Sequence, residues 1–273
     1  MTEGPQRIVC LTEEPTEVLY ALGQQHRIVG ISGFTVRPPQ ARREKPKVSA
    51  FTSAKVEQIL ELQPDLAIGF SDIQADIAQA LIKKGVEVWI ANHRSVAGIL
   101  AYIRRLGALV GVHEPAERYA RDLEARIDRA REAAARLPGR PRVYFEEWDQ
   151  PLICGIRWVS ELVEIAGGRD IFADRSSSSL AQGRIVSNPD DVIDADPDLI
   201  IGSWCGKKFR PEQVAARPGW PRITAVRDGE LHEIKSPLIL QPGPAALTDG
   251  LDALQAIVAR WASRSEPLSQ RRQ

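Results

Sequence analysis

The side chains best suited to chemistry in this sequence are aromatic rings and charged groups that follow strand-like segments. In open α/β sheets, ligands bind beyond the carboxyl ends of the strands, so these positions predict a binding cleft. Trp and Phe rings supply large rigid faces at little entropic cost, and Arg and Lys fix the polar groups of a ligand. The candidate contact residues are Phe34, Arg37, Phe51, Phe70, His93, Glu147, Trp148, Arg157, Trp158, Trp204, Lys207, His232 and Gln241.

Three of the six Trp residues, Trp148, Trp158 and Trp204, are expected in loops that follow strands of the second half. Each ring alone could equally be packed in the core. Together, on loops, the three rings favour the wall of a binding site. The neighbouring cations Arg157 and Lys207 then form a rim that grips polar groups of the ligand.

A metal site is a weaker interpretation of the same loops. Glu146, Glu147 and His232, with Cys205 or His93, have side chains that bind metals, but the sequence lacks HxxxH, CxxC and HExxH spacings. We therefore predict no metal site and no resident cofactor.

An enzymatic function is disfavoured because the sequence lacks the common catalytic motifs. It contains no GxSxG elbow, P-loop or GxGxxG. Glu146 and Glu147 are adjacent, so they point to opposite sides of a continuing strand and are poorly placed as an acid/base pair. We predict no catalytic residues and no enzymatic activity.

Two α/β halves must position these residues. Hydrophobic periodicity and Gly or Pro breakers predict a strand-rich pattern in which helices alternate with short buried strands. In the first half, the expected strands are 7–11, 28–32, 66–70 and 86–91, the expected helices are 16–22, 56–62, 76–84 and 96–110, and 34–47 is expected to be a loop. In the second half, the expected strands are 142–145, 199–202 and 231–234, the expected helices are 159–166, 190–195 and 245–261, and 146–157 is expected to be a loop.

One long helix is expected at mid-chain, over 114–137. Its apolar residues recur every three or four positions, acid-before-base pairs at i,i+4 line the other side, and Pro138-Gly139 ends it. We interpret it as a stiff connection between two lobes. The predicted division is therefore an N-terminal α/β lobe at 1–113, a connecting helix at 114–137 and a C-terminal α/β lobe at 138–273.

The two halves repeat each other in three blocks that recur in one order. Residues 7–10 match 142–145, residues 16–23 match 160–167, and residues 56–69 match 189–202. The last pair shares a helix, a Pro-Asp turn and a buried strand. This repetition predicts two Rossmann-like lobes, each with a parallel sheet and helices on its faces, joined by the single long helix.

Composition excludes several classes of function. Lys and Arg number 36 and Asp and Glu number 36, so the net charge gives no reason to expect a nucleic-acid partner. No apolar run approaches the ~18 residues of a membrane span. The start of the sequence shows no signal peptide, which predicts a cytoplasmic location, with the periplasm as the alternative. The three Cys residues suggest no disulfide framework, and we expect a monomer.

Residues 7–261 resemble the class III periplasmic binding proteins, which carry vitamin B12 and ferric siderophores for ABC transporters. The resemblance rests on the strand at 8–11 with Thr16-Glu17, on Gly30-Ile31-Ser32 ahead of Pro38-Pro39, and above all on the helix–Pro-Asp–strand unit at 57–69. It implies two α/β lobes joined by one long helix. It also implies that a corrinoid or a ferric or other metal chelate is bound between the lobes for an ABC-type importer.

The resemblance further implies a docking role for one acidic residue on each lobe, where the family contacts Arg residues of the permease. Glu57 and Asp190 occupy the matching positions, and Asp190 departs from the usual Glu by its shorter side chain. Both could instead be solvated residues that favour a helix N-terminus. Two alternative functions stay open: a cytoplasmic cofactor carrier or sensor descended from the family, and a metal- or cofactor-handling enzyme of chelatase-like architecture.

Overall fold

The computed structural model describes residues 4–265, and within them the chain forms two units. Unit 1 contains residues 4–93, 97–124 and 241–244, and unit 2 contains residues 94–96, 125–240 and 245–265. Each unit is an α/β structure with its own sheet, so the predicted pair of α/β halves is confirmed. The three-part division at residues 113 and 138 stays a prediction.

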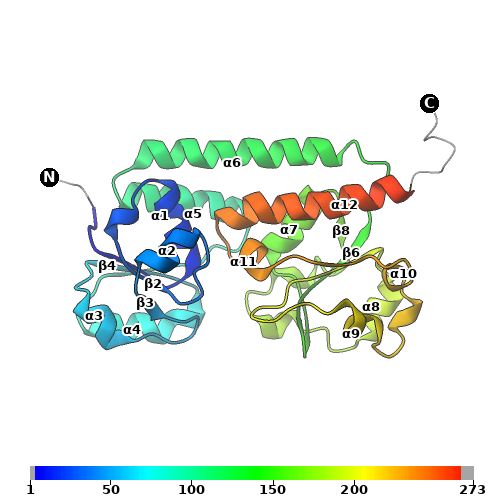
Figure 1. The fold of residues 1–273 in the computed structure, drawn as a ribbon, viewed down its shortest axis with the longest axis horizontal. Coiled ribbons are helices and arrows are strands. Elements are labelled where there is room, and N and C mark those ends of the chain that lie inside the picture. The colour runs from blue at the N-terminus through cyan, green and yellow to red at the C-terminus, as the bar shows by residue number, and fades with distance from the viewer. Residues whose placement is uncertain (1–3, 266–273) are drawn as a thin grey trace. The chain divides into compact units, whose positions relative to one another are not determined.

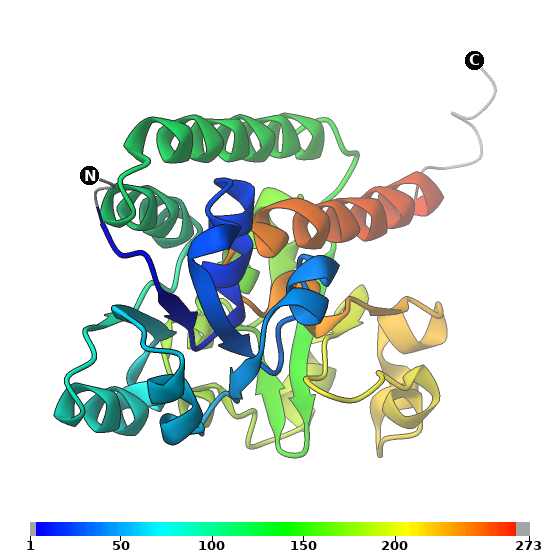
Figure 2. The ribbon, with the colours of Figure 1, turned by 60° about the vertical axis from the view of Figure 1, so that its left-hand side comes forward.

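The sheet of unit 1 is wholly parallel, in the order β3-β2-β1-β4-β5. Its blue strands lie side by side in Figure 2. The strands are β1 (Ile8–Cys10), β2 (Ile28–Ser32), β3 (Lys47–Ser49), β4 (Leu66–Phe70) and β5 (Val88–Ala91). Every residue of β1 and β4 is buried, which is why both read as unbroken apolar runs. All five strands present their carboxyl ends at one edge, where a ligand site is expected.

Helices connect these strands in the predicted alternation. They are α1 (Glu13–Ala21), α2 (Pro39–Glu44), α3 (Val56–Glu61), α4 (Ala75–Lys83) and α5 (Val96–Leu109), with short 3-10 turns η1 (Gln25–Arg27) and η2 (Asp72–Gln74). The prediction of a loop over 34–47 was wrong, because α2 forms within it. Pro39 is the first residue of α2, a position where proline's fixed φ helps and its missing N–H costs nothing.

The sheet of unit 2 has the order β10-β9-β6-β7, with β8 also paired to β6. Its strands are β6 (Arg142–Asp149), β7 (Leu152–Cys154), β8 (Arg169–Asp170), β9 (Leu199–Gly202) and β10 (Leu231–Glu233). Two predictions need correction here. The sheet is mixed, because β7 runs antiparallel to β6, and the loop expected at 146–157 is largely the β6–β7 hairpin. The turn Gln150-Pro151 joins the two strands and permits this direct return.

The helices of unit 2 are α7 (Arg157–Ile165), α8 (Asp190–Ala195), α9 (Pro211–Ala215), α10 (Thr224–Arg227), α11 (Ser236–Ile239) and α12 (Leu251–Ser265). Its short turns are η3 (Arg175–Ser177), η4 (Ala181–Arg184) and η5 (Trp220–Arg222), and a π-helical stretch, η6 (Ala246–Gly250), precedes α12. The final helix expected at 245–261 is therefore a π turn followed by a regular helix. Aromatic residues, among them Tyr144, Phe172 and Trp220, pack together in the core of this unit.

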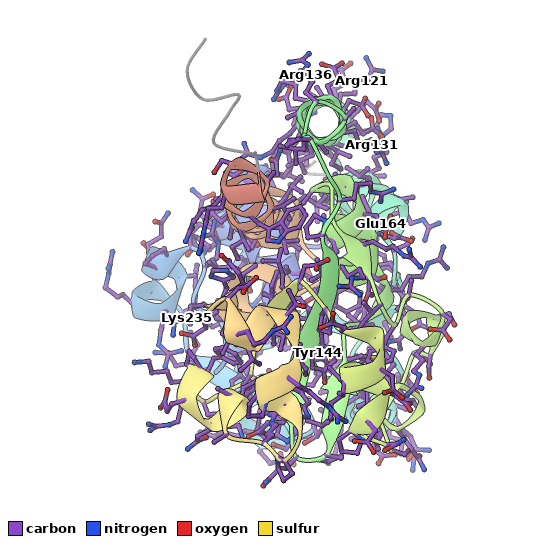
Figure 3. All side chains as sticks on the ribbon, turned by 90° about the vertical axis from the view of Figure 1, so that its right-hand side faces the viewer. Arg121, Arg131, Arg136, Tyr144, Glu164 and Lys235 are labelled. Carbon is purple, nitrogen blue, oxygen red and sulfur yellow. The ribbon has the colours of Figure 1, made fainter. Side chains whose placement is uncertain are left out.

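The long helix predicted at mid-chain is α6 (His113–Ala134), a single uninterrupted helix in Figure 1. Residues up to 124 belong to unit 1 and residues from 125 belong to unit 2. Five residues of the predicted stripe are buried: Ala116, Ala120, Leu123, Ile127 and Ala130. The other three, Tyr119, Ala134 and Leu137, are half-buried, and the helix ends at Ala134 rather than at 137 as predicted. On the wet side, Glu117 pairs with Arg121 at 2.8 Å. Arg121 and Arg131 point away from the ribbon in Figure 3, which looks along the helix.

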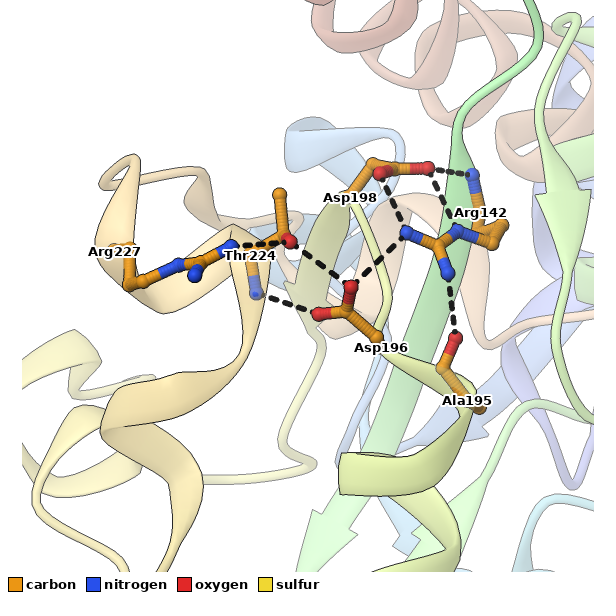
Figure 4. Close-up of polar contacts among 6 residues, drawn as sticks. All are labelled: Arg142, Ala195, Asp196, Asp198, Thr224 and Arg227. Atoms are coloured by element: carbon orange, nitrogen blue, oxygen red, sulfur yellow. Dashed lines mark hydrogen bonds and ion pairs between the residues drawn. The ribbon is translucent and has the colours of Figure 1, made fainter.

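The Pro-Asp turns of the internal repeat have matching structures in the two units. In unit 1, Asp65 accepts hydrogen bonds from the backbone N–H groups of Gln6 (2.6 Å) and Arg7 (2.9 Å). In unit 2, Asp198 accepts from the backbone N–H of Arg142 (2.8 Å) and from its guanidinium, which also donates to the carbonyl of Ala195 (Figure 4).

The residue directly before the proline of each repeat has the same backbone conformation. Gln63 and Asp196 have positive φ angles of 47° and 41°, which reverses the chain after α3 and α8. Pro64 and Pro197 follow directly and prevent either helix from continuing. The repeated sequence therefore encodes the same helix-ending Pro-Asp turn, which leads into β4 in unit 1 and into β9 in unit 2.

Candidate ligand-binding site

The carboxyl edge of the unit 1 sheet carries exposed aromatic and apolar side chains. Phe34, in the loop after β2, is 50% exposed, and Val36 in the same loop is 39% exposed. Phe51, in the loop after β3, is half-buried. Phe70 is the last residue of β4 and is only 5% exposed, so its ring is buried beneath the surface at this edge of the sheet. Among these candidates, Phe34 and Phe51 have faces that a ligand can contact.

His93 belongs to a buried stack of rings rather than to an open surface. Its ring stacks on Tyr102 with centroids 4.4 Å apart and meets the Phe70 ring edge-on at 5.3 Å. Its Nε2–H donates to the carbonyl of Pro242 at 2.7 Å. Because the side chain is 9% exposed, His93 acts in this structure as a support for the strand-end loops.

Two adjacent carboxyl groups at the start of α1 are buried. Glu13 is 8% exposed and Glu14 is 1% exposed, and Oε2 of each lacks a hydrogen-bond partner within residues 4–265. Glu13 accepts from Gln241 (3.3 Å) and Glu14 from the Thr12 hydroxyl (2.7 Å). Burial raises the pKa of Glu13 to about 7 and that of Glu14 to about 8.

Arg37, in the loop after β2, adds a cation to the candidate residues at the carboxyl edge of the unit 1 sheet. Its guanidinium lies 3.0 Å from the Glu17 carboxylate of α1, and its side chain is 33% exposed. The pairing orients the Arg37 guanidinium while leaving part of it accessible. Such a guanidinium can bind a carboxylate or phosphate group by paired hydrogen bonds.

At the carboxyl edge of the unit 2 sheet, Lys207 lies over two indole rings. Its ammonium is 4.2 Å from the centroid of Trp148 and 5.0 Å from that of Trp204, and it forms an ion pair with Asp149. Each indole face attracts the cation, and the carboxylate fixes its position. Trp148 is half-buried and Trp204 is 4% exposed, so Trp148 offers the larger accessible surface.

Glu146 holds Trp204 in place from inside the unit. Its carboxylate is completely buried and accepts from the Trp204 indole N–H at 3.0 Å. It also accepts two hydrogen bonds from Arg217, at 2.6 and 2.8 Å. Glu147, on the opposite side of β6, pairs instead with the buried Arg184. The two carboxylates therefore serve separate ion pairs, as the alternation along a strand predicts.

The expectation that three Trp residues lie in loops was wrong for two of them. Trp148 lies in β6, which continues past its predicted end, and Trp158 lies in the first turn of α7. Trp158 is 3% exposed and its N–H donates to the carbonyl of Ile239 at 2.9 Å, so its ring packs in the core. Trp204 follows β9 as predicted.

Two other charged candidates also have partners within unit 2. Arg157, exposed at the start of α7, pairs with Glu161 at 2.9 Å. His232, in β10, lies 2.8 Å from the buried carboxylate of Glu230. These pairs leave Arg157 accessible at the surface and hold His232 partly buried.

Sequence reasoning missed the residues that hold the aromatic side chains in place. Arg217 and Arg184 lie 71 and 37 positions from their glutamate partners, and no local spacing announces such pairs. Asp149 was the missed residue that could most easily have been predicted, because it follows Trp148 directly in the sequence. An acidic residue next in sequence to a predicted ligand-contacting ring is the signal that could have identified it.

The proposed docking residues lie in the first turns of two short helices. Glu57 is the second residue of α3 and Asp190 the first of α8, and both are exposed. Across residues 4–265, no three His, Cys, Asp or Glu side chains are placed to hold a metal ion. Within that same range, every helix is too short or too polar to span a membrane.

The comparison with known proteins settles the class of the chain. The family model described as "Periplasmic binding protein" matches residues 8–238. This chain belongs to the periplasmic binding protein family. Its members are solute-binding proteins rather than enzymes, normally act outside the cytoplasm, and work with an ABC permease. The resemblance inferred from the sequence is thereby confirmed.

Individual members of the periplasmic binding protein family are similar over most of the chain. The vitamin B12-binding protein of Vibrio campbellii is 26% identical over 204 residues, which cover 73% of this chain and 72% of that protein. The structure resembles the periplasmic heme-binding protein RhuT of Roseiflexus, with a TM-score of 0.77, 26% identity and coverage of 93% and 100% of the two chains. It also resembles the vitamin B12-binding protein BtuF of Vibrio cholerae, with a TM-score of 0.73, 22% identity and coverage of 96% and 99%.

Proposed function

We propose that this protein binds a metal chelate, either a corrinoid or a ferric chelate, and delivers it to an ABC importer. The arrangement of Lys207 over Trp148 and Trp204 carries the proposal. It places a wide indole face beside a fixed cation at the carboxyl edge of a sheet. A macrocycle or chelate with acidic or amide side groups needs both an apolar face and a polar anchor. The related B12- and heme-binding proteins bind ligands of this chemical class.

Each unit has its own candidate contact residues. Unit 2 offers Trp148 as the stacking face, with Lys207 and Arg157 as polar anchors. Unit 1 offers the exposed ring of Phe34, the half-buried ring of Phe51 and the guanidinium of Arg37. The other candidates are buried or partly buried: Phe70, His93, Glu147, Trp158, Trp204, His232 and Gln241.

Delivery to a permease requires an accessible charged surface, and Glu57 and Asp190 supply one on each unit. Each carboxylate lies in the first turn of its helix and is exposed, so that an Arg side chain of a permease can reach it. We propose the periplasmic side of the membrane as the place of action, in keeping with the family. The cytoplasmic location and the monomeric state expected from the sequence stay predictions, which cell fractionation and light scattering test.

Purification of the native protein from the cells that make it tests the proposed ligand. We expect the eluate to show the visible absorbance of a corrinoid or ferric chelate and to contain stoichiometric cobalt or iron. The matched control is the Trp148→Ala protein prepared in the same way, which should elute with less of the absorbing ligand. A colourless, metal-free eluate from cells supplied with both kinds of chelate contradicts the proposal.

A further inference from the structure

A single buried glutamine ties together three loops at the carboxyl edge of the unit 1 sheet. Gln74 ends η2 and is completely buried. Its Oε1 accepts from the backbone N–H of Phe70 at 3.0 Å. Its Nε2 donates to the carbonyls of Leu11 at 3.3 Å and Phe51 at 3.1 Å. One amide group thus joins the end of β1, the loop after β3 and the end of β4.

The chain is adapted locally to bring this amide under the sheet edge. Ser71, directly after β4, has φ 61° and ψ 174°, a conformation that normally only glycine adopts. Its hydroxyl accepts from the N–H of Ile73 at 3.3 Å and starts η2. Gly69 leaves the space that Gln74 occupies, since a Cβ there would lie 2.4 Å from Gln74 Oε1.

The pattern of donors and acceptors requires a side chain at this position that both donates and accepts. The Leu11 carbonyl also accepts from the Ser49 hydroxyl at 3.0 Å, so it keeps a partner if Gln74 is lost. The Phe51 carbonyl and the Phe70 N–H depend on opposite ends of the same amide. A carboxylate could serve only the N–H, and an apolar side chain could serve neither.

We infer that Gln74 is a positioning residue for ligand binding, holding the backbone of Phe51 so that its ring presents a fixed face to the ligand. This inference rests on the proposed function, because Phe51 is one of the contacts proposed there. The half-buried Phe51 ring is carried by a loop, and a loop positioned by its own backbone hydrogen bonds loses less freedom when ligand binds. The same amide fixes Phe70, whose ring packs edge-on against His93.

A double-mutant cycle with calorimetric titration tests the inference, with cyanocobalamin, cobinamide, hemin and a ferric hydroxamate as probes. For the probe that the wild-type protein binds, Gln74→Met should weaken affinity about tenfold, the effect expected when one buried polar group loses its partner. In a Phe51→Ala background the same substitution should change affinity by no more than about twofold. Gln79→Met, at an exposed position of α4, is the matched control and should leave affinity unchanged.

Gln74→Glu is the conservative variant, because a completely buried carboxyl group is favoured in its neutral form and can then accept from the Phe70 N–H and donate its O–H to the Phe51 carbonyl. We expect it to fold with a thermal midpoint closer to wild type than that of Gln74→Met, and to retain most of the affinity that Gln74→Met loses. Equal losses in the wild-type and Phe51→Ala backgrounds, or unchanged affinity in both Gln74 variants, overturn the inference alone. Failure of the wild-type protein to bind any probe overturns the proposed function and the inference with it.

Discussion

Glu146 and Arg217 form a two-point ion pair inside unit 2, with Oε2–Nη1 and Oε1–Nη2 distances of 2.6 and 2.8 Å. The carboxylate is fully buried and the Arg217 side chain is 18% exposed. Arg217 also lies over the Trp220 ring at 4.4 Å, and Glu146 holds the Trp204 indole. The pair therefore connects the aromatic core of the unit to the edge where a ligand is expected to bind.

Removal of one member of this pair should be costly. Arg217→Met leaves the Glu146 charge buried and uncompensated, and we expect it to lower the free energy of unfolding by about 3–5 kcal/mol. The double variant Glu146→Met with Arg217→Met removes both charges and should recover most of that loss. Urea denaturation of the three proteins measures the difference. A double variant no more stable than Arg217→Met would mean that packing of the arginine stem, not pairing of its charge, accounts for the loss.

Substitutions of the half-buried Trp148 and the buried Trp158 should separate ligand affinity from stability. Trp148→Ala removes the accessible indole under Lys207, and we expect an affinity loss of about thirtyfold, as for other central aromatic contacts. Trp158→Phe keeps a ring in the core but removes the hydrogen bond to Ile239, so it should lower stability and leave affinity within about twofold. Calorimetric titration and thermal unfolding of both variants check this. Comparable affinity losses would restore Trp158 to the contact surface predicted from the sequence.

Stability should fall as pH rises toward 8, because two carboxyl groups are buried in their neutral form. The folded-state pKa values of Glu13 and Glu14, about 7 and about 8, lie above the ordinary value of 4.5. Unfolding therefore releases protons at pH values between 4.5 and about 8. Their stabilising contribution is complete below pH 4.5, declines as pH rises, and is lost above about pH 8. We expect Glu13→Gln with Glu14→Gln to be more stable than wild type at pH 8.5 by roughly 2 kcal/mol.

Urea midpoints between pH 5 and 9 measure this pH dependence. The double Gln variant should show a flatter profile than the wild-type protein over the range from 5 to 8. Identical slopes in the two proteins would show that Glu13 and Glu14 ionise in the folded state at their ordinary pKa. The Glu61→Gln protein, altered at an exposed position, serves as the control for removal of a carboxylate.

Charge reversal at the two docking positions should block delivery without affecting ligand capture. We expect Glu57→Lys with Asp190→Lys to reduce ligand uptake by cells at least tenfold, because each change replaces an attraction to a basic permease surface by repulsion. Ligand affinity of the purified double variant should match wild type. Glu61→Lys with Asp194→Lys changes charge at exposed positions of the same helices and should support normal uptake. Equal uptake by both double variants would remove Glu57 and Asp190 from the docking surface.

The repeated Pro-Asp turn could be read from the sequence because its causes are local. Pro64 with Asp65 and Pro197 with Asp198 end a helix and turn the chain within a few residues. Only the backbone N–H groups that the two Asp carboxylates accept from are distant in the sequence. Central strands such as β4 and β9 match their predicted bounds, because residues buried on both faces leave an unbroken apolar run. The apolar stripe of α6 could also be predicted, because its residues recur every three or four positions.

The details of the candidate site depend on contacts between residues that are distant in the sequence, and no local pattern predicts these contacts. Whether Trp158 faces a ligand or the core depends on Ile239, which is distant in the chain. The β6–β7 hairpin was hidden because Glu146-Glu147 interrupts its apolar pattern, and both carboxylates are stabilised there by remote arginines. Gln74 looks like an ordinary polar residue until the fold brings Phe51 and Phe70 to its amide.

Calorimetric titration of the purified protein with cyanocobalamin, cobinamide, hemin and a ferric hydroxamate tests the central claim most directly. We expect one of these metal chelates to bind with a stoichiometry of one and a Kd of about 1 μM or tighter, near −8 kcal/mol or more favourable. Its visible spectrum should shift on binding, and the Trp148→Ala protein should bind it more weakly. The absence of heat and of any spectral change with all four chelates would contradict the account.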